Sequence, residues 1–132
     1  MKLSSLECKI ELLCSLNPSE DPSKVESAVE NIFPNSKIIT EKFSVKGQSN
    51  DLHSLEKILE DSKSRHSQRI YRRTLEKNLN DNSTWFYLNK QAAFAEKIAI
   101  CEESDESPLG PIKIVLTSTN IERIIDWLIH DE

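Results

Sequence analysis

Glycine, cysteine and long apolar runs are scarce in this chain of 132 residues, and each scarcity argues against a class of protein. Two glycines, Gly47 and Gly110, cannot build a glycine-rich phosphate loop. The cysteines are three, an odd number, so we expect buried reduced thiols and no disulfide framework. No apolar run approaches the roughly 18 residues of a membrane-spanning helix, and the N-terminus lacks the apolar block of a signal peptide. We therefore expect a cytoplasmic protein that makes no membrane contact.

Patterns typical of catalysis or metal binding are also missing. His53, His66 and His130 fall in different predicted elements without ligand spacing, so we expect no metal site. No nucleophile elbow is visible, and the acidic run over 102–106 lacks the spaced ligands of a calcium loop. We expect no catalytic residue, no cofactor and no enzymatic activity.

The composition is that of a globular chain, with 37% hydrophobic and 30% charged residues. A chain of 132 residues is long enough to bury a hydrophobic core, and no linker, repeat or low-complexity segment divides it. We expect a single domain over residues 1–132.

Hydrophobic periodicity predicts the elements of the first half of the chain. Apolar residues alternate with polar ones over 6–16, which predicts a strand with one buried face. An Asp-Pro pair at 21–22 supplies the N-cap and first-turn proline of a helix whose apolar stripe runs over 25–33. A second strand is expected over 36–45, followed by a loop at 47–50.

The second half of the chain adds helices and three more strands. The predicted elements are helices over 52–59 and 65–79, strands over 84–88, 97–101 and 112–116, and a helix over 121–129. The order β-α-β-α-α-β-β-β-α contains no regular βαβ repeat. It predicts an α+β two-layer sandwich, with helices packed on one face of a mostly antiparallel sheet.

Basic residues are concentrated in one segment, although the chain has a net charge of −5. Residues 63–77 hold six basic side chains and one acid, so their net charge is 6 − 1 = +5 and that of the remainder is −5 − 5 = −10. On a helical wheel one arc carries Arg65, Arg69, Arg72, Arg73 and Lys77. Guanidinium groups pair with phosphate oxygens, so this arc is a candidate phosphate-binding face. Alternatively it is a solvated face whose arginines pair with Glu76 or with the acidic C-terminal region.

Three aromatic residues stand together before a polar interruption. Alternation places Phe86 and Leu88 on one side of the predicted strand, and Trp85 and Tyr87 on the other.

The polar interruption, Asn89-Lys90-Gln91, has two interpretations. It is a turn between two strands, because polar residues are common in turns, or it is a tip whose amides contact a ligand. If the tip is functional, Lys90→Ala and Gln91→Ala leave folding intact and weaken binding of that ligand.

The blocks at 86–95, 101–103 and 106–112 resemble an uncharacterised archaeal protein family that is labelled predicted RNA-binding or exosome-associated. The basic residues of 68–73 and the Asp-Pro helix start are similar to those of the same family, and the similarity covers nearly the whole chain. The resemblance implies a cytoplasmic protein with an α+β fold similar to that of the large-subunit ribosomal protein five family, without assigned catalytic residues. Glu96 departs from the family pattern, in which we expect a small residue, often glycine, at this position. We therefore expect the chain path just after Phe94 to differ from that of the family.

These observations favour an RNA-binding or RNA-processing accessory protein. The candidate contact residues are Arg65, Arg69, Arg72, Arg73, Lys77, Asn89, Lys90 and Gln91. Single-stranded or structured RNA suits them better than duplex DNA, because no groove-reading motif is visible. If five cations met phosphates of a single strand, log affinity would fall against log salt with a slope of about −3.5. The alternative is a protein-interaction module or homodimer whose basic helix pairs with an acidic partner surface.

Overall fold

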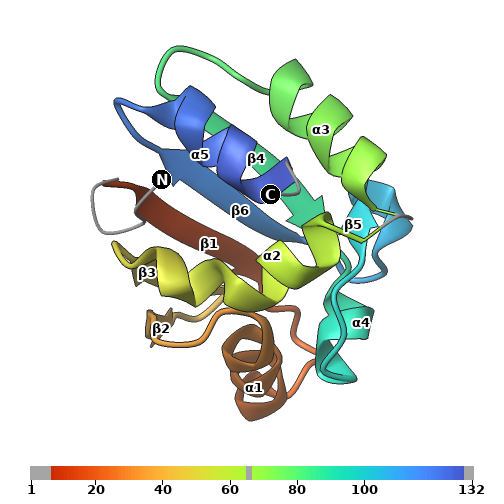
Figure 1. Cartoon of the computed structure of the whole chain (residues 1–132). Helices are drawn as coiled ribbons and strands as arrows, with labels where there is room; N and C mark the ends of the chain where they lie inside the picture. The colour runs from red at the N-terminus through yellow and green to blue at the C-terminus, as the bar shows by residue number, and fades with distance from the viewer. Residues whose placement is uncertain (1–6, 65–66, 130–132) are drawn as a thin grey trace.

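The computed structural model describes residues 7–64 and 67–129, which fold around one six-stranded antiparallel sheet (Figure 1). The strands are β1 (Lys9–Ser15), β2 (Lys37–Thr40), β3 (Ser44–Ser49), β4 (Ser83–Leu88), β5 (Ile100–Cys101) and β6 (Ile112–Thr117). The helices are α1 (Pro22–Ile32), α2 (Glu56–Ser62), α3 (Gln68–Lys77), α4 (Lys90–Phe94) and α5 (Ile121–Ile129), with 3₁₀ turns η2 (Leu52–Leu55) and η3 (Ser104–Glu106). The strand order is β2-β3-β1-β6-β4-β5. The predicted α+β class is confirmed.

One face of the sheet meets the helices and forms the core. Alternate residues of the strands are buried there, among them Ile10, Leu12, Phe86 and Ile114 at 0% exposure. Figure 1 shows α2 and α5 lying across this face and α3 running alongside β4. Each fully buried aliphatic or Phe side chain contributes about 1.5–3 kcal/mol through the area it removes from water, so this face supplies most of the hydrophobic stabilisation.

The start of α1 is confirmed as predicted. The Asp21 carboxylate accepts a hydrogen bond from the backbone N–H of Ser23 at 3.0 Å, and Pro22 occupies the first turn. Its buried stripe consists of Val25, Ala28, Val29 and Ile32, and Phe33 directly after it is also buried.

The single strand predicted over 36–45 and the loop predicted at 47–50 are wrong. The chain forms a hairpin instead, in which β2 pairs with β3, and β3 continues through Gly47 to Ser49 beside β1. A Cβ on Gly47 would lie 3.0 Å from Cδ2 of the Phe33 ring, so the absent side chain makes room for that ring. Glycine, which normally indicates a loop, here marks a close approach within a strand.

Residues 89–101 also differ from the prediction. Asn89 caps the short helix α4 by accepting a hydrogen bond from the N–H of Ala92 at 3.0 Å, so the connection between β4 and β5 is not a simple turn. The predicted strand over 97–101 is reduced to Ile100–Cys101. Glu96 has a φ of 62°, in the left-handed region that favours glycine, so the backbone follows the path that a glycine would adopt there.

Candidate nucleic-acid interface

Helix α3 separates apolar and basic side chains as the wheel predicted. Its buried residues are Tyr71, Thr74 and Leu75, and its exposed cations are Arg69, Arg72, Arg73 and Lys77. Arg65 lies outside the described residues. The basic side chains therefore point away from the core, where an anionic ligand can reach them.

Buried contacts fix the orientation of α3. The Tyr71 hydroxyl donates to Oδ2 of Asp61 at 2.9 Å, and its ring meets the ring of Phe86 edge-on at a centroid distance of 5.5 Å. The Thr84 hydroxyl of β4 donates to the carbonyl of Leu75 at 2.7 Å. These contacts hold the helix against β4, so its basic face has a defined direction.

One of the exposed cations of α3 is paired with an acid. The Arg73 guanidinium forms an ion pair with the Glu102 carboxylate, and both side chains remain exposed. Within residues 7–64 and 67–129, no carboxylate lies within 4.0 Å of the charged groups of Arg69, Arg72 or Lys77. The Arg73–Glu102 pair agrees with the alternative interpretation, in which arginines of a solvated face pair with acids of the same chain, whereas Arg69 forms no such pair among the described residues.

A cleft of about 390 Å³ joins the basic helix to two aromatic side chains. Side chains of the α3 region and of β4 line it, among them Arg73, Lys77, Trp85 and Tyr87. The acidic segment 102–104 completes the lining with Glu102 and Glu103. The Asn78 side-chain amide donates to the carbonyl of Trp85 at 2.9 Å, which ties the end of α3 to the strand. The volume falls within the range of roughly 300–1,000 Å³ typical of small-ligand sites.

The aromatic walls of the cleft belong to the face of β4 that turns away from the core. Phe86 and Leu88 are buried, whereas Trp85 and Tyr87 are only half-buried, so the predicted division of this strand is confirmed. The centroids of the Trp85 and Tyr87 rings lie 4.9 Å apart. Nζ of Lys113, on the neighbouring strand β6, lies 4.6 Å from the Trp85 ring centroid in a cation–π contact.

The proposed polar tip at 89–91 is not formed. Lys90 is 0% exposed, and its ammonium donates to the carbonyls of Ser15 and Leu109, each at 2.9 Å, and to Oε1 of Glu20 at 3.0 Å. An ammonium with these partners is not presented to a ligand, so the expectation of an accessible Lys90 is wrong. The acidic partner lies 70 residues upstream, where no local pattern could have indicated it.

The two other tip residues have different positions. The Asn89 side chain serves as the cap of α4, whereas Gln91 is exposed and its amide donates to the carbonyl of Pro108 at 3.3 Å. We therefore leave Asn89 and Lys90 out of the candidate interface. A ligand contact by Gln91 stays a prediction.

The Glu20 carboxylate is held in its charged form. Burial raises its pKa, but hydrogen bonds from the backbone and side chain of Asn17 and from Lys90 outweigh burial and bring the pKa below the ordinary value of 4.5. The Glu20 carboxylate is therefore ionised at neutral pH, and the Lys90–Glu20 pair joins three separate segments of the chain.

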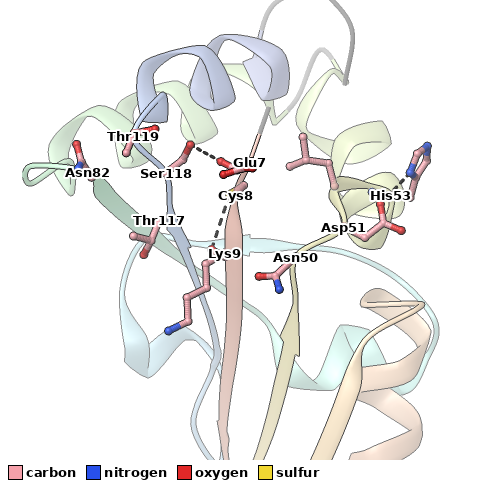
Figure 2. Close-up of a pocket in the computed structure, with 11 residues that line it drawn as sticks. Glu7, Cys8, Lys9, Asn50, Asp51, His53, Asn82, Thr117, Ser118 and Thr119 are labelled. Carbon is pink, nitrogen blue, oxygen red and sulfur yellow. Dashed lines mark hydrogen bonds and ion pairs between the residues drawn. The ribbon is translucent and has the colours of Figure 1, made fainter. Parts of the chain in front are cut away.

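A second, larger pocket of about 850 Å³ lies at one end of the sheet (Figure 2). Figure 2 shows Asp51 and His53 at one side of it, with Nδ1 of His53 2.9 Å from Oδ1 of Asp51. Burial raises the pKa of the Cys8 thiol in its wall to about 11, so this thiol is protonated at neutral pH.

The three cysteines are free and buried, as expected. Among the described residues, no three His, Cys, Asp or Glu side chains are close enough together to hold a metal ion. Over the same ranges, no helix has the length and apolar character needed to cross a membrane.

Comparison with known proteins gives consistent matches over most of the chain. A family model described as RNA binding matches residues 9–118. A UPF0201 protein of Methanothermobacter thermautotrophicus is 41% identical over 125 residues, which cover 93% of this chain and 92% of the relative. A UPF0201 protein of Sulfurisphaera tokodaii is 36% identical over 124 residues, which cover 91% of this chain and 86% of the relative.

A solved structure supports the same relationship. The crystal structure of a UPF0201 protein from Methanococcus jannaschii matches with a TM-score of 0.76 and 26% identity, over 94% of each chain. The resemblance seen in the sequence blocks at 86–95 and 106–112 is thereby confirmed.

Proposed function

The chain belongs to the archaeal family of UPF0201 proteins and matches the family model described as RNA binding, and from this membership we propose an RNA-binding accessory protein without enzymatic activity. The proposal includes a cytoplasmic location. The proposed contact surface consists of the exposed cations of α3 and the cleft beside Trp85 and Tyr87, and we call it the α3 surface.

The observation that carries the proposal is the cleft itself, because it brings together the two kinds of group that bind RNA. Arg73 and Lys77 can neutralise phosphates, and Trp85 and Tyr87 offer aromatic edges and faces to bases. Neither set alone would favour RNA over another anion or an apolar ligand. Their common position supports a nucleic acid.

Among the acids outside residues 63–77, Glu102 and Glu103 line the cleft and oppose this surface at short range. The net charge outside residues 63–77 is −10, but charges more than about 8 Å away are largely screened at physiological ionic strength. More distant acids instead repel RNA that approaches other parts of the protein surface. Glu102 is the acid that competes directly, because it occupies the Arg73 guanidinium.

A filter-binding titration against a short single-stranded RNA at several salt concentrations tests the proposal. Four phosphate contacts, one for each described cation of α3, give a slope of log affinity against log salt of about −3. The double variant Arg72→Gln/Lys77→Gln removes two contacts, so the slope becomes shallower by about 1.4.

Two further variants sharpen this test. Lys24→Gln/Lys42→Gln removes the same charge from exposed positions on α1 and in the β2–β3 turn, and we expect it to leave the slope unchanged. Glu102→Gln frees Arg73, so we expect RNA to bind about two- to fivefold more tightly.

A flat salt response of the unaltered protein, or equal losses in the two double variants, would refute the proposal. If RNA binding is absent and light scattering shows a dimer that dissociates in salt, the basic face serves protein contact instead.

A further inference from the structure

The face of the sheet opposite the core is lined by half-buried and exposed side chains from four neighbouring strands. Cross-strand pairing sets Tyr87 beside Lys113, Lys113 beside Leu13, and Leu13 beside Lys46. Trp85 lies two residues before Tyr87 on the same face. We call these five residues the open face. Leu13 is 40% exposed and Tyr87 and Trp85 are half-buried, so apolar and aromatic groups are accessible beside the Lys113 ammonium. The Lys46 ammonium pairs with the Glu41 carboxylate at 3.0 Å.

We propose that the open face binds an unpaired stretch of RNA, and that one base stacks on the Trp85 ring in place of the Lys113 ammonium. This inference rests on the proposed function, because it names the kind of RNA that the α3 surface takes. It also extends the site from the cleft onto the sheet.

The contact between Lys113 and Trp85 is suited to being exchanged. Nζ of Lys113 lies 4.6 Å from the ring centroid, and within residues 7–64 and 67–129 no carboxylate lies within 4.0 Å of this ammonium. Cation–π contacts at accessible sites are weak, whereas stacking of a base on an aromatic ring is stronger. A base that takes the ring face therefore releases the ammonium, which can then pair with a phosphate of the same strand.

The two acids that line the cleft, Glu102 and Glu103, each have a partner. Glu102 pairs with Arg73, and the Glu103 carboxylate accepts the backbone N–H of Glu106 in the capping box of η3. The cation of the cleft that lacks a carboxylate partner in the described part of the chain is Lys77. Lys77 and the aromatic pair line the same cleft, so an RNA strand that follows α3 can contact both.

The requirement for an unpaired strand follows from geometry. In duplex RNA each internal base lies between its neighbours in the stack, so an aromatic side chain cannot cover its face. A duplex could still contact the cations of α3 through its phosphates. Preference for single strands is therefore the property that separates stacking on Trp85 from charge attraction alone.

Tryptophan fluorescence gives a direct test, because the chain has two tryptophans and Trp127 lies on α5, partly buried against the core. In the full chain carrying Trp127→Phe, Trp85 is the remaining tryptophan. We expect oligouridine to quench its emission with the same midpoint as binding, and a blunt RNA duplex of equal length to leave it unchanged.

Variants of Trp85 provide the second readout. Trp85→Ala should weaken oligouridine binding about 5- to 150-fold, with little change for the duplex, and Trp85→Phe should retain much of the affinity. Circular dichroism checks that both variants are folded. The quenching measurement needs no change at Trp85, so it decides the question even if Trp85→Ala does not fold.

Four outcomes would overturn the inference. Salt-sensitive RNA binding with unchanged Trp85 emission, or duplex binding as tight as single-strand binding, would refute stacking and leave the proposed function standing. A change of Trp85 emission with protein concentration in the absence of RNA would show that a second copy covers the open face. Absence of binding to either RNA would refute the proposed function as well.

Discussion

Replacing Lys90 by methionine removes the ammonium that joins three distant segments of the chain. It donates to the carbonyls of Ser15 and Leu109 and to the Glu20 carboxylate, and the Lys90 and Glu20 side chains are 0% and 6% exposed. Water therefore cannot take over these bonds in the variant. Removing one partner of a buried ion pair costs about 3–5 kcal/mol, because the other charge stays buried without compensation.

The expected loss is large relative to the total free energy of unfolding. Domains have a free energy of unfolding of about 5–15 kcal/mol, so Lys90→Met should remove a substantial fraction of it. The measurement is urea denaturation at pH 7, followed by circular dichroism. Lys97→Met, at an exposed position just after α4, is the matched control and should change stability by less than about 0.5 kcal/mol.

Measurements in acid and a double variant separate the contribution of the Lys90–Glu20 ion pair to stability from that of side-chain packing. The pKa of Glu20 is lowered in the fold, so the pair contributes fully above the unfolded pKa and its contribution is lost as the pH falls through the folded pKa. The penalty of Lys90→Met should therefore shrink in acid. Glu20→Gln combined with Lys90→Met should cost less than the sum of the two single changes. A loss below about 1 kcal/mol for Lys90→Met at pH 7 would refute the assignment of a buried, uncompensated charge.

Two other predictions concern the core and the support of α3. Gly47→Ala places a Cβ 3.0 Å from Cδ2 of Phe33, so we expect urea denaturation to show a loss of about 1–3 kcal/mol, and unchanged stability would contradict the tight packing. Burial raises the pKa of Asp61 above the ordinary 3.8 despite its hydrogen bond from Tyr71, so its charge is disfavoured in the fold and this cost disappears as the pH falls through the raised pKa. Relative to the unaltered chain, Asp61→Asn should therefore raise the free energy of unfolding most at neutral pH, and this gain should disappear in acid. Denaturation at a series of pH values that showed the reverse trend would contradict this.

Elements with strong local signals were predictable from the sequence. The alternation of β1, the capped start of α1 and the two arcs of α3 each depend on residues within a few positions of one another. The exposure of the α3 cations follows from the same periodicity, because burying Tyr71 and Leu75 turns Arg69 and Arg72 outward. These features required no knowledge of the tertiary structure.

Other features depend on partners that are distant in the sequence. Gly47 belongs to a strand because the Phe33 ring lies over it, and Lys90 is buried because Glu20 and two carbonyls meet its ammonium. In each case the residue type favours the opposite local interpretation, a loop for glycine and the surface for lysine. The alternation of β4 was enough to predict that Trp85 faces away from the core. Its contact with Lys113 was not predictable, because it depends on the pairing of β4 with β6.

The position of β6 has a consequence for how the chain reaches its fold. It lies between β1 and β4, so it is the strand that joins the group β2-β3-β1 to the group β4-β5. Its register sets Thr117 opposite Lys9, which requires a loop of roughly 100 residues to close, and such non-local pairing slows folding. While the chain is being synthesised, one edge of β1 has no partner until residues 112–117 have emerged. Until then this unpaired edge can pair with another chain, so we expect aggregation of the nascent protein to depend on how soon residues 112–117 are made.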